Sequence, residues 1–591
     1  MKTRAFVGVL IALVIVLGLV PIAAAQTGPR VQEITGHIDN DTPVLYYELP
    51  GLQAGEVVYL WVEATSGDLD TYLFLGLAGG EGAGGFGQMV AEDDDGGNNY
   101  NSRLTYRVDV AGDYRVAMTR YLGYSTSGDF RLLVGIDDPA VFDGTAKPST
   151  DALVLPVDLG INVAALHTTD CSLLAVRPYL SGSEQTVITK YFVVHYTASG
   201  YDAVTPEYLD MAVEMLDTVW QTEVDQFGWP APPADCGEGG DERYDVYLLD
   251  TLGSEDAMGY TSPEELVGDN PNSPLIEGWA TYSYLAIDND FDGWDDPRAA
   301  LYATAAHEFH HAIQFGYDIG DSGEWLYEAT ASWMETQVFP VEEDATPYIV
   351  DLFDLPDLCV GSTPDDPYYG TRIYAEWLII DSIAQDYGTE AIQQLWQLIG
   401  EYDGMENFYE FAAALGTTPQ EIMTRVAIRN LLRDYALGDR FEATVHIENS
   451  LKALGDVSSV GSGVEELGVN YVHIPQPGLY SFSIDQPGLE MTLVGVDVAA
   501  GTAQVFRLGQ SGTVDTTPFD HAFVIVLNTA QHDDPYSCTA VDWTITVGDG
   551  TGQALVAADG EAWDASNFIA PGEEVPAARG EDESSIRDVL R

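Results

Sequence analysis

Residues 298–338 constrain the fold of this chain most strongly, because they combine a helical pattern with a grouping of metal-ligand residues. The sequence His307-Glu308-Phe309-His310-His311 lies in a segment rich in good helix formers. Asp296 can cap this helix at its start, Pro297 suits its first position, and Gly316 can end it. We therefore predict one continuous helix between Pro297 and Gly316.

On this helix His307 and His311 lie one turn apart on the same face, so both imidazoles can bind one zinc ion. Glu308 follows the first ligand and is placed to contact a metal-bound water rather than the metal. His310 lies three residues from His307, but the general-base geometry around Glu308 requires His311 as the second ligand. We therefore interpret His310 as a neighbour that packs or forms hydrogen bonds.

A catalytic zinc site needs three protein ligands and one open position, so a third ligand must come from elsewhere. Glu328 is the best candidate, because a short reversal through residues 316–321 can place a second helix antiparallel to the first. Glu324 and Glu335 are rivals. Because Glu335 lies two turns after Glu328 on the same face, periodicity alone does not decide between them.

The second helix, with Trp325-Leu326-Tyr327-Glu328-Ala329-Thr330-Ala331-Ser332-Trp333, resembles the glutamate-bearing helix of the aminopeptidase branch of the gluzincin metallopeptidases. That resemblance assigns the third ligand role to Glu328. The aminopeptidase signature Gly-x-Met-Glu-Asn, which binds the free amine of a substrate, is not found upstream. Residues 306–314 resemble instead the pattern Ala-His-Glu-Phe-x-His-Ala-Ile-Gln of secreted bacterial metalloproteases.

The resemblance covers residues 168–440 and implies an α+β, zincin-like metallopeptidase core. It implies a zinc endopeptidase in which Glu308 takes a proton from water and passes it to the leaving nitrogen. Tyr369 and Tyr374 are candidates for the donor that stabilises the negative carbonyl oxygen, with Tyr369 the preferred one. The predicted strand at residues 279–287 offers an edge on which an extended peptide can add. The alternative function is a catalytically inactive extracellular binding protein on the same scaffold.

Residues 26–138 show alternating apolar runs separated by Gly, Asp and Asn turns, which predicts a β-sandwich. Gly67-Asp68-Leu69-Asp70-Thr71, Gly112-Asp113-Tyr114 and Ser127-Gly128-Asp129-Phe130 resemble the bacterial pre-peptidase C-terminal domain, which accompanies secreted peptidases. Asp68, Asp70 and Asp93 are candidate calcium ligands. The other interpretation is that they are acidic turn residues.

Asp288, Asp290 and Asp292, followed by Gly293, match the start of a calcium-binding loop. The glutamate that closes such a loop is missing, because Ala299 stands at its position. The segment is therefore either a calcium site or an acidic turn that leads into the predicted metal helix.

The other parts of the chain are predicted from composition and spacing. Residues 1–25 have a charged start, an apolar run and a small-residue end, which predicts a signal peptide and secretion. Residues 139–167 are predicted as a linker, 441–547 as a second β-sandwich, and 548–591 as a disordered acidic tail. The expected architecture is thus an α+β peptidase core flanked by two β-sandwiches.

The formal net charge of −72 excludes nucleic acid as an expected partner, because the phosphates would be repelled. Protein or peptide substrates are expected, with a monomeric protein and no membrane span after removal of the signal peptide. Four cysteines can form two disulfides outside the cytoplasm, and we favour a pair between Cys171 and Cys236.

Overall fold

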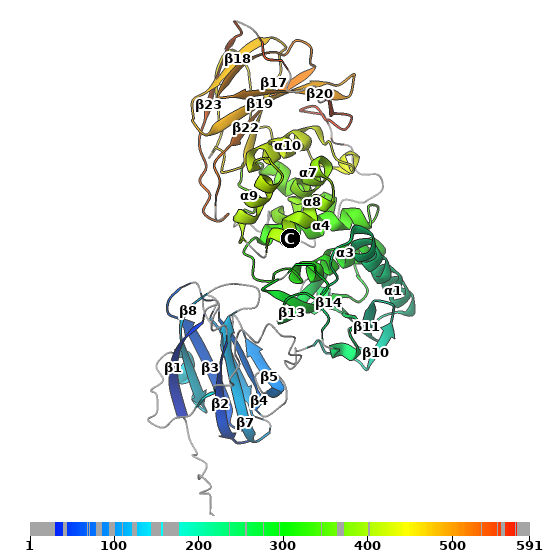
Figure 1. Ribbon diagram of the computed structural model, residues 1–591, viewed down its shortest axis with the longest axis vertical. Coiled ribbons are helices and arrows are strands. Elements are labelled where there is room, and N and C mark those ends of the chain that lie inside the picture. The colour runs from blue at the N-terminus through cyan, green and yellow to red at the C-terminus, as the bar shows by residue number, and fades with distance from the viewer. Residues whose placement is uncertain are drawn as a thin grey trace, which may run out of the picture.

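The computed structural model describes residues 30–575 apart from internal gaps, of which the longest are 79–85, 94–100, 121–126, 144–154, 158–176 and 363–370. The chain is a mixed α+β protein with several separate sheets, as Figure 1 shows. Within the described residues no helix is long and apolar enough to cross a bilayer.

Two antiparallel sheets near the N-terminus enclose one apolar core. The first has the order β1-β8-β3-β6 and the second β5-β4-β7-β2-β9. Their strands are β1 (Arg30–Ile38), β2 (Val44–Leu52), β3 (Val57–Ala64), β4 (Thr71–Ala78), β5 (Phe86–Asp93), β6 (Arg103–Arg107), β7 (Gly112–Arg120), β8 (Gly128–Ile136) and β9 (Leu155–Val157). Residues 139–167 were predicted as a linker, but β9 lies within them and pairs with β2. Pairing with a distant strand leaves no local signal in the sequence, so the linker prediction was wrong at β9.

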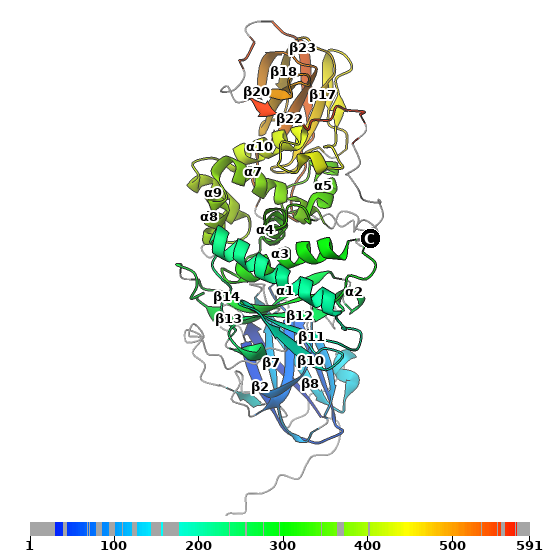
Figure 2. The same cartoon turned by 90° about the vertical axis from the view of Figure 1, so that its right-hand side faces the viewer.

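The central sheet has the order β10-β11-β12-β14-β13. Its strands are β10 (Glu184–Ile188), β11 (Phe192–Thr197), β12 (Tyr244–Leu249), β13 (Gly259–Gly268) and β14 (Ala280–Asp288). Strands β11, β12 and β14 run parallel, whereas β10 and β13 form antiparallel edges. Helices α1 (Pro206–Trp220) and α3 (Pro297–Phe315) lie along one side of this sheet (Figure 2).

The prediction that residues 279–287 form a strand open to a peptide was wrong, because β14 is internal. Strands β12 and β13 pair with β14 on its two sides, and every residue of β14 is buried. Among the described strands, the outer strand beside α3 is β13 instead. Strand order depends on pairing with distant segments, so the residues of β14 alone do not show whether it lies at an edge.

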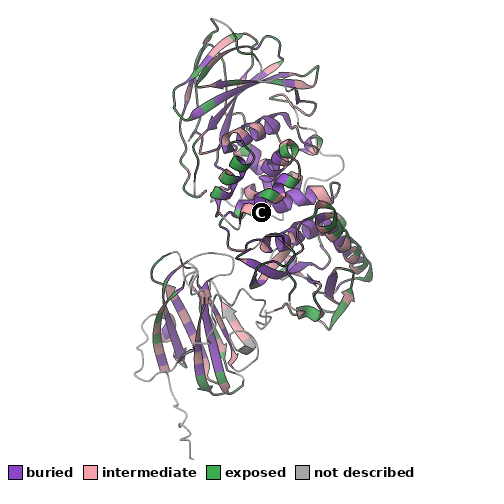
Figure 3. Ribbon diagram, in the orientation of Figure 1, coloured by how far each residue is buried: buried purple, intermediate pink, exposed green. Residues whose placement is uncertain are grey.

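The predicted helix between Pro297 and Gly316 is confirmed as α3. The Asp296 carboxylate accepts hydrogen bonds from the backbone N–H groups of Arg298 and Ala299, Pro297 takes the first position, and the helix ends before Gly316. Most of α3 is buried, as the purple colour in Figure 3 shows. The remaining helices are α2 (Thr251–Ser254), α4 (Glu324–Val338), α5 (Ala345–Asp354), α6 (Arg372–Ala375), α7 (Trp377–Tyr387), α8 (Glu390–Ile399), α9 (Met405–Ala414) and α10 (Pro419–Leu432).

The C-terminal part contains two further sheets, with the orders β15-β17-β22-β19-β20-β24 and β16-β23-β18-β21, around an apolar core. Their strands are β15 (Asn449–Ser450), β16 (Gly455–Ser458), β17 (Val469–Ile474), β18 (Leu479–Ile484), β19 (Leu489–Asp497), β20 (Thr502–Gly509), β21 (Ser511–Asp515), β22 (His521–Asn528), β23 (Thr544–Asp549) and β24 (Trp563–Asp564). The prediction of a disordered tail from residue 548 was wrong for β24. Its Trp563 is buried against the Arg425 and Arg429 guanidinium groups, a distant contact that composition does not reveal.

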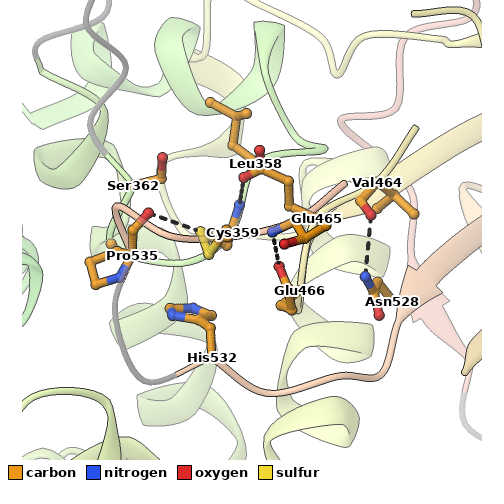
Figure 4. The surroundings of a disulfide bond; sticks show 12 residues. Leu358, Cys359, Ser362, Val464, Glu465, Glu466, Asn528, His532 and Pro535 are labelled. Atoms are coloured by element: carbon orange, nitrogen blue, oxygen red, sulfur yellow. Dashed lines mark hydrogen bonds between the residues drawn. A yellow bond between two sulfur atoms is a disulfide. The ribbon is translucent and has the colours of Figure 1, made fainter. Parts of the chain in front are cut away.

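A disulfide joins Cys359, in the segment after α5, to Cys538, after β22. Figure 4 shows it beside Glu465, whose carboxylate accepts a hydrogen bond from the Cys359 backbone N–H at 3.0 Å. The favoured pair Cys171–Cys236 lies outside the described residues, and its pairing stays a prediction.

Candidate metal centre

The two histidines of the motif project from α3 into one small region. His307 and His311 are both buried, at 8% and 9% exposure, and their ring centroids lie 4.8 Å apart. One helical turn separates the residues, so the backbone of α3 alone places the two imidazoles side by side.

Helix α4 packs against α3 and brings Glu328 to the same place. Glu328 Oε2 lies 3.1 Å from His307 Nε2 and 3.6 Å from His311 Nε2. The ligand atoms of His307, His311 and Glu328 all lie within 4.8 Å of one another. Two imidazole nitrogens and one carboxylate oxygen form the donor set that zinc prefers in catalytic sites, so these side chains fit that ion.

The surrounding charges favour the ionised form of Glu328. Although burial disfavours the charge, the His311 and His307 imidazoles hold the pKa of the Glu328 carboxyl well below its usual value. A carboxylate that stays ionised at neutral pH is available as a metal ligand.

Each histidine is oriented by a second hydrogen bond through its Nδ1 atom. Glu335 Oε1 lies 2.8 Å from His307 Nδ1, and Gln314 Oε1 lies 2.6 Å from His311 Nδ1. The Gln314 amide N–H in turn donates to the Tyr327 backbone carbonyl at 3.0 Å. A proton on each Nδ1 leaves both Nε2 lone pairs free to bind a metal. The rival Glu335 is thus placed behind His307.

Glu308 points toward the edge strand β13. The Thr261 hydroxyl lies 3.0 Å from Glu308 Oε2 and 2.6 Å from the Glu308 backbone oxygen. Sequence reasoning did not identify Thr261, because nothing local marks a threonine 47 residues before Glu308.

Tyr374, on α6, lies beside the candidate metal ligands. Its ring is stacked on the His307 ring with a centroid distance of 5.7 Å. The Glu328 charge and burial hold the pKa of the Tyr374 phenol well above its usual value, so the phenol stays protonated and can donate. The preferred candidate, Tyr369, lies outside the described residues.

His310 contacts Glu223 rather than the candidate metal ligands. Its Nδ1 atom lies 2.9 Å from Glu223 Oε2, and both side chains are fully buried. Glu223 belongs to a π-helical turn, Gln221–Phe227, that continues α1. This contact agrees with the interpretation of His310 as a packing neighbour.

The candidate calcium residues are engaged as turn residues where the structure describes them. Asp288 accepts hydrogen bonds from the Asp290, Phe291 and Leu252 backbone N–H groups, and Asp290 accepts one from Asp292. Among the described residues these carboxylates do not gather into a metal-binding group, so calcium has no support there.

In the N-terminal sandwich, Asp93 accepts a hydrogen bond from the Arg103 backbone N–H at 2.5 Å. The other two candidates, Asp68 and Asp70, lie outside the described residues, so calcium at that place stays a prediction.

Cys359, His532 and Cys538 also lie close together. The two sulfur atoms are joined in the disulfide, which removes them as thiolate ligands, so this group is not a metal site.

A family of unknown function, DUF6055, matches residues 293–458, from just before α3 to the end of β16. No curated protein matches the chain. The ZmpB metallopeptidase from Clostridium perfringens is 11% identical and covers 81% of this chain and 91% of its own, with a TM-score of 0.25. The catalytic module of the metalloprotease ZmpA from the same organism is 10% identical and covers 82% of this chain and 97% of its own, with a TM-score of 0.25.

The periplasmic lysozyme inhibitor PliG from Aeromonas hydrophila is 16% identical and covers 18% of this chain and 88% of its own, with a TM-score of 0.15. Proteins with remote structural similarity therefore include metallopeptidases.

Proposed function

We propose that this protein is a secreted, zinc-dependent endopeptidase. The observation that carries the proposal is the convergence of His307, His311 and Glu328 from two helices, with Glu308 beside them. Three ligands that leave a coordination position open are what a hydrolytic zinc site requires.

Glu308 is the general base in this proposal. Zinc bound by the three ligands would lower the pKa of a coordinated water and polarise the carbonyl group of the substrate. The Glu308 carboxylate takes one proton from the attacking water and then passes it to the nitrogen that leaves.

Tyr374 is the group in the described residues best placed to donate to the negative carbonyl oxygen. Its phenol is held in the protonated form, and its ring lies against His307. One donor of this kind is typically worth about 2.7–4 kcal/mol in transition-state stabilisation.

The free edge of β13 is the surface on which an extended peptide would bind by adding a strand. The strand begins Gly259-Tyr260-Thr261-Ser262-Pro263 and lacks the Gly-x-Met-Glu-Asn signature for a free amine. This supports cleavage within a chain rather than removal of its first residue.

Secretion is supported by the Cys359–Cys538 disulfide, because such bonds persist mainly outside the cytoplasm. The signal peptide predicted for residues 1–25 lies outside the described residues.

The decisive experiment compares the wild-type protein with Glu308→Gln. We expect the wild type to bind one equivalent of zinc and to cleave denatured casein, and a chelator to abolish cleavage until zinc is restored. Glu308→Gln should keep the zinc and lose hydrolysis by at least about 100-fold, since it keeps the shape but removes the base.

Glu324→Gln is the matched control, because it makes the same change on the exposed start of α4 and should leave hydrolysis intact. Hydrolysis that survives Glu308→Gln would rule out the assigned base. A wild type that binds zinc without cleaving casein or a peptide library would favour the inactive binding protein.

A further inference from the structure

The edge strand β13 lies directly against helix α3. A Cβ atom on Gly259 would lie 2.7 Å from Thr304 Cγ2 and 2.8 Å from the Ala286 backbone oxygen, closer than real side chains pack. The absence of a side chain at Gly259 therefore lets the strand approach α3. Two residues later, on the same side of the strand, Thr261 reaches Glu308.

The Thr261 hydroxyl has two acceptors on one residue. It lies 2.6 Å from the backbone oxygen of Glu308 and 3.0 Å from the Oε2 atom of the same residue. A hydroxyl carries one proton and two lone pairs, so it donates to one of these oxygens at a time and can still accept a hydrogen bond.

We propose that Thr261 is the positioning residue for Glu308, an inference that rests on the proposed peptidase function. Its hydroxyl donates to the ionised carboxylate and holds it in one rotamer while the base awaits its proton. When Glu308 carries the proton taken from water, that proton sits on the other carboxylate oxygen, from which it passes to the leaving nitrogen, and the Thr261 hydroxyl keeps its contact with Oε2. The contact therefore persists in both states.

This contact also links substrate to base. A peptide that adds to β13 takes its register from the backbone of that strand. Because Thr261 belongs to β13 and also contacts Glu308, this one strand positions both the carbonyl group of the bound peptide and the Glu308 carboxylate. Small errors in the distance between these two groups would lower the rate of hydrolysis strongly.

The test compares Thr261→Val, which keeps the shape but removes the hydroxyl, with Thr261→Ser, which keeps the hydroxyl. We expect Thr261→Val to lower kcat roughly 10-fold to 100-fold, the effect of losing one hydrogen bond to a charged group. KM should change less than about 2-fold and bound zinc should stay at the wild-type level. Thr261→Ser should keep kcat within about 3-fold of the wild type.

Crystal structures of the zinc-bound wild type and both variants give a readout that needs no activity. The Glu308 carboxylate should stay within hydrogen-bond distance of residue 261 in the wild type and in Thr261→Ser, and leave that position in Thr261→Val. An unmoved carboxylate in Thr261→Val, or equal losses of kcat in both variants, would overturn the inference. An inactive wild type whose carboxylate responds as expected would overturn the peptidase function alone.

Discussion

Two glutamates two turns apart on α4 have different relations to the imidazoles of α3. Glu328 faces the Nε2 atoms of both histidines, whereas Glu335 lies 2.8 Å from the Nδ1 atom of His307. The sequence left them as rivals because they share a helix face. The crossing of α3 and α4 separates their roles, since each position along α4 meets a different atom of the same ring.

Glu335→Leu should weaken zinc binding about 10-fold to 100-fold, because it removes the group that orients His307 while keeping the buried volume filled. Glu335→Gln should have a smaller effect, since its amide oxygen can still accept from Nδ1. The dissociation constant is measured by competition with a fluorescent zinc chelator. Wild-type affinity in Glu335→Leu would show that the contact is only a packing contact.

At the scale of elements, Asp321 ties the starts of two helices together. One carboxylate oxygen accepts from the Gly323 N–H at 2.6 Å, immediately before α4, and the other accepts from the Gly404 N–H at 3.3 Å, immediately before α9. The Asn407 amide adds a third hydrogen bond at 2.5 Å. Since α4 carries Glu328, this carboxyl anchors the segment that presents the third proposed ligand.

Burial, with the nearby Asp403 charge, raises the pKa of Asp321 from 3.8 to about 7. The folded protein therefore holds this proton more tightly than the unfolded chain does. The contribution of this bound proton to the free energy of unfolding is fully present below about pH 4 and is lost as the pH rises through about 7. This contribution is at most about 4 kcal/mol.

In Asp321→Asn the free energy of unfolding should consequently fall less between pH 5 and pH 8 than it does in the wild type. Urea unfolding followed by tryptophan fluorescence at the two pH values measures this difference. Asp292→Asn, which changes an exposed carboxyl, should follow the wild-type profile. Identical pH profiles for Asp321→Asn and the wild type would contradict the assignment.

At the scale of the whole molecule, the C-terminal sheets are held to the helical region by the Cys359–Cys538 disulfide and by the buried Tyr471 hydroxyl, which donates to the Ala427 backbone oxygen at 3.0 Å. Arg372 donates to the backbone oxygens of Leu358 and Cys359 and pairs with Glu376. Arg372 lies two residues before Tyr374, so the segment next to the disulfide also supports the proposed oxyanion donor.

Replacing both cysteines, Cys359→Ser with Cys538→Ser, should lower the free energy of unfolding by about 2–5 kcal/mol. The bond closes a loop across a sequence separation of 179, so its loss frees many conformations of the unfolded chain. Denaturant unfolding of the oxidised wild type, the reduced wild type and the double variant measures the effect. The reduced wild type should match the variant, and equal stability of all three would contradict the expectation.

The helix predictions succeeded where the signals were local. The Asp296 cap bonds the N–H groups expected of it, because capping depends on residues two or three positions apart. The predictions that failed, those for β14 as an open strand, β9 as linker and β24 as tail, all concerned pairing with distant segments.

The amino-acid sequence by itself determined the helix at residues 297–315, the spacing of His307 and His311, and a second helix with Glu328 and Glu335 on one face, because helical periodicity depends only on residue spacing. Only the tertiary structure decided which glutamate meets which nitrogen, that β13 and not β14 is the outer strand of the described sheet, and that Thr261 reaches Glu308. Those relations depend on the crossing of the helices and on the order of the strands in the sheet. Contacts between residues far apart in the chain set the helix crossing and the strand order.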